Sequence, residues 1–166
     1  MSIMIKHYPQ NAYCADFFRV VDFLKQHGAY GFNRNWHWAR WEWLLGHSNL
    51  DKATLSQIGI FEEDGTIVGI ATHDMRPGEA YIICNPDFQH IKPEMVKYVE
   101  ENLTNNGESG IYINAKDEVL IDCVKASGYR VCDQKEYVLA LDAEKANCLM
   151  PLIAVFQLQI ILAAKT

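Results

Sequence analysis

Residues 79–103 decide the fold of this chain. They read EAYIIC over 79–84, NPDFQHIK over 85–92 and PEMVKYVEENL over 93–103, which predicts a strand, a short loop and a helix that begins at a proline. A strand that runs into the start of a helix makes a phosphate site, because free backbone N–H groups and the helix dipole both face the ligand. The segment therefore predicts an α/β domain with its candidate site at the loop before this helix.

Two tight turns lead into the strand 79–84. Asp64-Gly65 separates strands predicted at 57–62 and 67–74, and both central positions of a type I′ hairpin turn need a positive φ. Pro77-Gly78 suits a second tight turn, because proline fixes φ and glycine supplies the positive φ of a type II turn. The two turns predict a three-stranded antiparallel meander that leads into the helix.

Further elements are predicted on both sides of the meander. They are a strand at Ile3–Tyr8, helices at Ala12–His27 and Trp36–Leu45, a strand at Gly110–Ala115, a helix at Asp117–Ala126, and a final hairpin of Tyr129–Val131 with Glu136–Asp142. We expect residues 1–142 to form one domain, since a chain of 166 residues can build one core. Residues 143–166 form an apolar tail, which we expect to pack on this domain or in a dimer interface.

The order of these elements resembles the architecture of the GNAT acyl-CoA N-acyltransferase superfamily. Asn85-Pro86-Asp87-Phe88 looks like the His-Pro-Asp-Tyr that follows the cofactor-side strand there, and Ala126-Ser127-Gly128-Tyr129 looks like the small-Gly-aromatic end of the fourth helix. Segments 40–43 (RWEW) and 58–62 (IGIFE) resemble the N-terminal repeat of bacterial proteins built from two GNAT-like halves. The resemblance implies an α/β fold with a mixed, mostly antiparallel sheet flanked by helices. It also implies acetyl-CoA as cofactor and acetyl transfer to a small amine.

The resemblance places an acetyl-CoA loop at residues 89–94, and this loop is degenerate. In the family it reads Arg or Gln, two residues, Gly, one residue, then Gly or Ala; Gln89 matches the first position, whereas Lys92 and Glu94 replace the small residues. Pro93 removes an N–H donor, and the carboxylate of Glu94 would repel a pyrophosphate. The positive charge of Lys92 could partly replace the lost contacts. The cofactor contacts that the resemblance implies are at Tyr81, Ile82, Ile83, Cys84, Gln89 and Lys92.

The catalytic group that is usual in the family does not carry over. The acid that protonates the departing thiolate there is a tyrosine four residues before the glycine that ends the fourth helix, and this position holds Val124. Candidate bases that could deprotonate an amine are Glu79, His73 and Asp74, on or beside the central strands. The alternative is that each is a solvated residue at a strand end.

All four tryptophans of the chain lie between residues 36 and 43, in a helix that borders the acceptor pocket in the family. Trp36, Arg40 and Trp43 lie near one helical face and are candidates for that pocket, because aromatic rings can enclose a cationic amine. The alternative is that the rings fill the gap between this helix and the sheet.

Composition limits the partners. The net charge of −6, with no long basic run, argues against nucleic acid. The 5 cysteines form no CxxC pair and the start lacks the core of a signal peptide, which predicts reduced thiols in a cytoplasmic protein. The 6 histidines show no ligand spacing, so we expect no metal. The apolar tail is too short and too polar to predict a membrane span.

Two functions stay open at this point. The first is a GNAT-like N-acetyltransferase domain that transfers an acetyl group from acetyl-CoA to a small amine, by direct attack in a ternary complex. The second is a catalytically silent GNAT-like module that has lost the pyrophosphate loop and binds a partner or ligand, or forms a homodimer. Residues 92–94 and Val124 favour the second function, and the resemblance itself favours the first.

Overall fold

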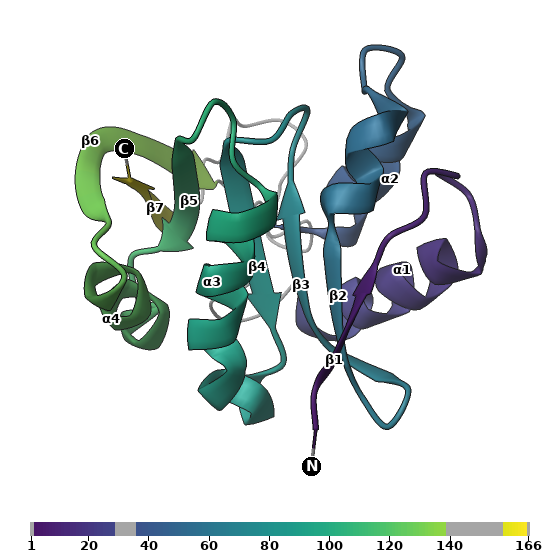
Figure 1. The fold of residues 1–166 in the computed structure, drawn as a ribbon, viewed down its shortest axis with the longest axis horizontal. Helices are drawn as coiled ribbons and strands as arrows, with labels where there is room; N and C mark the ends of the chain where they lie inside the picture. The colour runs from purple at the N-terminus through teal and green to yellow at the C-terminus, as the bar shows by residue number, and fades with distance from the viewer. Residues whose placement is uncertain (1, 29–35, 139–157, 166) are drawn as a thin grey trace, which may run out of the picture.

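The computed structural model describes residues 2–28, 36–138 and 158–165. Within them, one seven-stranded sheet runs through the molecule in the order β1-β2-β3-β4-β5-β7-β6 (Figure 1). All neighbouring strands are antiparallel except β4 and β5, which are parallel. The strands are β1 (Met4–His7), β2 (Gly59–Glu63), β3 (Thr66–His73), β4 (Glu79–Cys84), β5 (Ser109–Asn114), β6 (Arg130–Val138) and β7 (Leu158–Lys165).

Helices cover both faces of this sheet. One face carries α1 (Ala15–His27) and α2 (Trp38–Gly46), and the other carries α3 (Lys92–Asn102) and α4 (Glu118–Ala126). Two 3-10 helices, η2 (Lys52–Gln57) and η3 (Pro86–Ile91), precede β2 and α3. The mixed, mostly antiparallel sheet flanked by helices confirms the predicted fold class.

Strand β4 divides the core between the two faces. Tyr81 and Ile83 belong to the cluster of buried residues under α1 and α2, whereas Ile82 and Cys84 belong to the cluster under α3 and α4. This alternation follows from the two-residue period of a strand. One strand therefore presents side chains to both layers, and its continuation positions α3.

The turns around the meander have the predicted backbone. Asp64 and Gly65 have φ angles of 48° and 79°, so both central positions are left-handed as a type I′ turn requires. Gly78 has a φ of 104°, which a residue with a side chain rarely adopts. The observed β4 spans the predicted range 79–84.

The predicted final hairpin is wrong. Residues 130–138 form one strand, β6, and the step from Val131 to Lys135 is a register shift in its pairing with β7. The intervening residues 132–134 read CDQ and contain no glycine or proline to make a tight turn, so a bulge absorbs them.

Strand β7 comes from the predicted tail and lies between β5 and β6. Its pairing with β5 runs from Ser109↔Lys165 to Asn114↔Ile160. Ala163 of this strand is buried against the α3–α4 side of the core. The predicted domain boundary at residue 142 and the part of the tail up to residue 157 lie outside the described residues.

Candidate active site

The parallel strands β4 and β5 separate halfway along their length. They pair at Glu79↔Gly110, Ala80↔Ile111 and Tyr81↔Tyr112, and no pairing between them continues beyond this point in the described sheet. β4 goes on pairing with β3, and β5 goes on pairing with β7. The backbone edge of Ile82 and Ile83 that faces β5 therefore borders a wedge, which opens toward the carboxyl ends of both strands.

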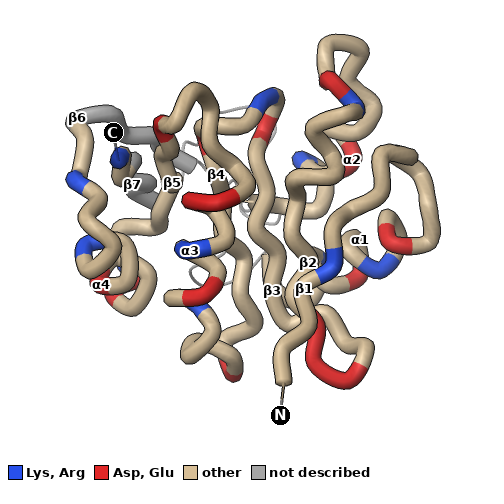
Figure 2. Tube along the Cα trace, in the orientation of Figure 1, with Lys and Arg blue, Asp and Glu red and all other residues tan. Residues whose placement is uncertain are grey.

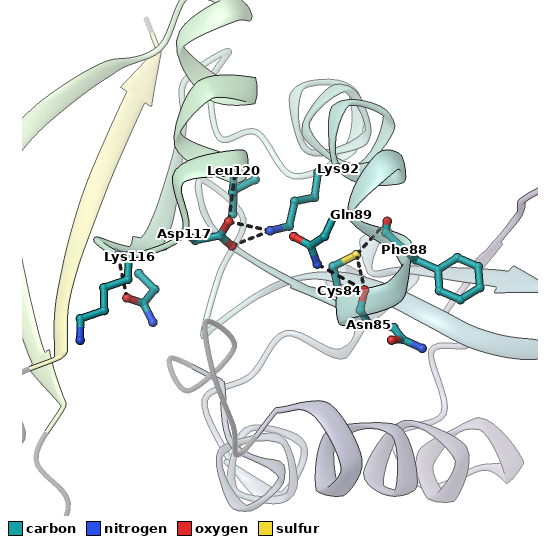
Figure 3. Close-up of polar contacts among 9 residues, drawn as sticks. Cys84, Asn85, Phe88, Gln89, Lys92, Lys116, Asp117 and Leu120 are labelled. Atoms are coloured by element: carbon teal, nitrogen blue, oxygen red, sulfur yellow. Dashed lines mark hydrogen bonds and ion pairs between the residues drawn. The ribbon is translucent and has the colours of Figure 1, made fainter.

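The loop after β4 folds back on itself. The side chain of Asn85 accepts from the N–H of Asp87 at 3.1 Å. The Gln89 amide nitrogen donates to the Asn85 carbonyl at 3.3 Å (Figure 3). The N–H of Lys92 donates to the carbonyl of Gln89, so η3 runs directly into α3. Gln89 is thus held by its own loop.

Lys92, whose charge we expected to offset the missing glycine loop, points instead to Asp117. Its ammonium nitrogen lies 2.6 and 2.7 Å from the two carboxylate oxygens of Asp117 (Figure 3). Both side chains are buried, with exposed fractions of 2% and 5%. Asp117 also caps α4, since its Oδ1 accepts from the N–H of Leu120 at 3.0 Å.

The wedge and the start of α3 differ in how well they fit acetyl-CoA. The edge of Ile82 and Ile83 can pair with the extended pantetheine arm, because only backbone groups are needed. The start of α3 does not fit the pyrophosphate: the N–H of Lys92 is already bonded, Pro93 has none, and Glu94 adds an exposed carboxylate. The residues present thus fit the pantetheine half of the cofactor and do not fit its pyrophosphate.

Cys84 ends β4 at the mouth of the wedge. Its sulfur lies 3.4 and 3.3 Å from the carbonyl oxygens of Asn85 and Phe88 (Figure 3). Burial raises the pKa of Cys84 to about 12. The side chain is therefore a thiol at neutral pH, which makes it a poor nucleophile for an acyl group.

An aromatic and cationic cluster lies on the other face of β4. The guanidinium of Arg40 sits 4.8 Å from the ring centre of Trp36 and 4.7 Å from that of Tyr81. Arg40 also donates to the Tyr81 hydroxyl at 3.0 Å and to Asp74 Oδ2. Tyr81 in turn stacks on Tyr112, with ring centres 5.0 Å apart and planes at 12°. These contacts join β3, β4, β5 and α2 at the last paired position before the wedge.

The three candidate pocket residues, Trp36, Arg40 and Trp43, do not lie in one place in the structure. Trp36 and Arg40 belong to this cluster, and Trp36 is fully buried just before α2. Trp43 is 53% exposed and its ring contacts His47, so it lies on the outer side of α2. The predicted pocket therefore reduces to Trp36 and Arg40, with Tyr81 and Tyr112 as the rings opposite.

The three candidate bases lie in different surroundings. His73 is buried, with ring nitrogens 2.8 Å from the Asp74 carbonyl and 3.1 Å from the Thr54 carbonyl. Asp74 bonds Arg40 through Oδ2, while its Oδ1 is buried and has no hydrogen-bond partner among the described residues. Glu79 is exposed at the opposite end of β4, where it lines a cavity of about 220 Å³ together with Arg76. Of the three candidate bases, Asp74 is the one that contacts Arg40 in the aromatic and cationic cluster.

Two further residues matter that the sequence did not single out. Tyr112 stacks on Tyr81, and Asp117 holds Lys92. An aspartate before a helix signals an N-cap, which Asp117 is, but no local pattern signals its second role. Val124 is buried in the α3–α4 core, so its position offers no acid. The Tyr129 hydroxyl lies 2.7 Å from Ser109 Oγ.

Comparisons with known proteins identify the fold. No family model matches the sequence, and a search of curated proteins by sequence gives no match. An acetyltransferase of the GNAT family from Streptococcus pneumoniae superposes with a TM-score of 0.53 at 11% identity, covering 99% of this chain and 98% of that one. A polyamine N-acetyltransferase from Drosophila melanogaster gives 0.62 at 12% identity, covering 99% of each chain. The PaiA N-acetyltransferase from Thermoplasma acidophilum, in complex with coenzyme A, gives 0.58 at 16%, covering 100% and 99%.

The described part of the chain therefore has the GNAT fold, as the resemblance in the sequence implied. Within the described residues, no helix is long and apolar enough to cross a membrane. The same residues contain no group of three or more His, Cys, Asp or Glu side chains that could hold a metal ion.

Proposed function

We propose that this chain is an N-acetyltransferase that takes an acetyl group from an acetyl-CoA-type donor and transfers it to a small amine. The observation that carries the proposal is the separation of β4 and β5 beyond Tyr81 and Tyr112. It leaves the backbone of Ile82 and Ile83 facing a wedge between parallel strands, where an extended arm can pair as a further strand would. The Thermoplasma neighbour of the same fold holds coenzyme A.

The acceptor amine would bind on the Trp36 side of β4. The rings of Trp36 and Tyr81 lie against each other, with centres 4.6 Å apart, and the guanidinium of Arg40 already contacts both, so these rings do not enclose a second cation. Within the part of the chain that the structure describes, Asp74 Oδ1 is a buried acceptor without a partner, which an N–H of the amine would satisfy. Asp74 is therefore our candidate for orienting the amine and receiving its proton, with Arg40 holding the carboxylate in place.

The test is a binding titration followed by a transfer assay. We expect acetyl-CoA to bind with a dissociation constant above about 10 μM, because the pyrophosphate contacts are missing. Thiol release with a panel of amines, including polyamines, then measures transfer. Asp74→Asn should lower kcat/KM for the amine and leave donor binding unchanged. Thiol release that is equal in the presence and absence of every amine would contradict the proposal.

A second candidate is the catalytically silent module. It is favoured by Val124 in place of an acid and by the engagement of Lys92 with Asp117. For this candidate, the titration gives no binding and the assay no thiol release.

The expectations about nucleic acid, dimerisation and location in the cell remain predictions. Basic and acidic residues are interleaved along the described trace (Figure 2). That nucleic acid is not a partner stays a prediction, which rests on the need of phosphate binding for clustered Lys and Arg. A homodimer and a cytoplasmic location stay predictions.

A further inference from the structure

The Lys92–Asp117 ion pair links the two helices that follow the diverging strands. α3 follows β4 and α4 follows β5, so the first turns of these helices flank the open end of the wedge (Figure 1). Lys92 is the first residue of α3, and Asp117 is the N-cap of α4. Figure 3 shows the ammonium and the carboxylate pointing toward each other between the two helices.

The Lys92–Asp117 ion pair is buried and joined by two hydrogen bonds. Both side chains are almost fully buried, and the ammonium meets both carboxylate oxygens at hydrogen-bond distance. A pair on the surface of the same helix, Lys97 and Glu101, shows the contrast: its atoms are 3.7 Å apart and both side chains are exposed. Removing one partner of a buried pair leaves an uncompensated charge, which makes the contact hard to break.

The same residues remove the means of holding a pyrophosphate. The N–H of Lys92 is bonded to Gln89, Pro93 has no N–H, and the ammonium of Lys92 is bonded to Asp117. The carboxylate of Glu94 in the first turn repels anions. A nucleotide at this helix start would meet one negative charge, without the N–H groups of residues 92 and 93 or the ammonium of Lys92.

We propose that the Lys92–Asp117 pair is a specificity-determining closure, which excludes the nucleotide end of an acyl-CoA and leaves the pantetheine arm as the part of the donor that is recognised. The inference rests on the proposed function. Its consequence is specific: S-acetylpantetheine, which ends before the pyrophosphate, binds as tightly as acetyl-CoA.

The first experiment uses the intact wild-type chain. Calorimetric titrations with acetyl-CoA and with S-acetylpantetheine should give dissociation constants within about threefold of each other. An acetyl-CoA affinity at least about tenfold higher would show that the phosphates are recognised, and it would overturn the closure while the proposed function stands. This comparison needs no variant, so it does not depend on how well a mutant folds.

The second experiment removes the Lys92–Asp117 ion pair by substitution. The double variant Lys92→Gly/Asp117→Asn removes both charges and restores a glycine, while asparagine keeps the cap of α4. Pro93 and Glu94 are unchanged, so a gain for acetyl-CoA reports the pair alone. Acetyl-CoA should bind about tenfold or more tighter than to wild type, because the phosphates can approach the backbone of residue 92 without a side chain in the way, and S-acetylpantetheine binding should be unchanged. Lys97→Gln, on the exposed face of the same helix, is the matched control and should leave both affinities as they are.

The remaining outcomes separate the two proposals. If wild type binds neither donor, the pantetheine arm is not recognised and the inference is overturned, even where the folded double variant binds acetyl-CoA. If neither protein binds either donor, both proposals fail. If wild type binds the two donors equally and the folded double variant does so too, the pair is not the element that excludes the nucleotide.

Discussion

The ring of Tyr98 in α3 lies directly against the backbone of Gly59, the first residue of β2. A Cβ placed on Gly59 would come within 2.6 Å of two carbons of that ring. The Tyr98 hydroxyl donates to the Gln57 carbonyl at 3.0 Å and lies 3.0 Å from His7 Nδ1. The ring is therefore held at its far end, and α3 approaches the sheet at a distance that requires a glycine at position 59.

We expect Gly59→Ala to lower the free energy of unfolding by about 1–3 kcal/mol, because the added methyl group overpacks a buried ring that cannot turn away. Urea unfolding measures the change. Gly46→Ala is the matched control: its Cβ would come no closer than 3.3 Å to the Tyr13 hydroxyl, and we expect a change of less than about 1 kcal/mol. Equal effects at the two positions would contradict the packing of α3 on β2.

The tryptophans around α2 should differ in their contribution to stability. Trp36 and Trp41 are fully buried, so replacing either by alanine should cost about 3–5 kcal/mol. Trp43 is exposed, and its replacement should cost less than about 1 kcal/mol. Thermal melts of the single variants give the order. A Trp43→Ala variant as unstable as Trp41→Ala would show that the face of α2 that carries Trp43 is packed against the rest of the protein.

Acid should destabilise the fold through Asp16. Burial alone would raise the pKa of this carboxyl group, but hydrogen bonds from Lys6 and Arg19 outweigh it and hold the pKa below its ordinary value. The carboxylate therefore contributes stability that is present above the unfolded pKa of about 4 and lost as the pH falls through the lower folded pKa.

Asp16→Asn tests this directly. At neutral pH the variant should be less stable than wild type, and the difference should shrink as the pH is lowered below about 4. Urea midpoints at several pH values give the comparison. A difference that stays constant with pH would assign the stability to packing and not to charge.

Strand β7 should be needed for the fold. A chain that ends at residue 157 loses the partner of both β5 and β6, and we expect it to aggregate because two strand edges become exposed. Lys165→Ala is the control, since it keeps the strand and removes a partly exposed ion pair with Glu100, worth less than about 1 kcal/mol, and a contact with the ring of Tyr129.

Light scattering of the intact and shortened chains reads out this result. The mass of the intact chain also tests the predicted homodimer. A shortened chain that remains a monodisperse, equally stable species would show that β7 is dispensable.

Much of the fold could be predicted because it is encoded by neighbours in the sequence. The turn at Asp64-Gly65 needs only two residues that tolerate a positive φ, and the range 79–84 needs only its apolar run between a turn and a proline-containing loop. Lys92, Pro93, Glu94 and Val124, at the positions where the resemblance implies a glycine loop and a tyrosine, were likewise visible in the sequence.

The candidate site was harder to predict, because its contacts join distant segments. Lys92 was expected to face an anion, yet its partner Asp117 lies 25 residues away on another helix. Arg40 and Tyr81 meet across 41 residues, while Trp43, close to Arg40 in the chain, lies outside the cluster. Helical spacing predicts which side chains share a face, but it does not say what that face will contact.

The sequence by itself determined the turns and the meander, since each depends on the preferences of a few adjacent residues. Only the tertiary structure decided where β4 and β5 separate, that β7 enters between β5 and β6, and that Lys92 and Asp117 tie α3 to α4. These features depend on pairing and burial between segments far apart in the chain. A buried ammonium is stable only where a carboxylate from elsewhere in the fold arrives to meet it, and no local pattern encodes that arrival.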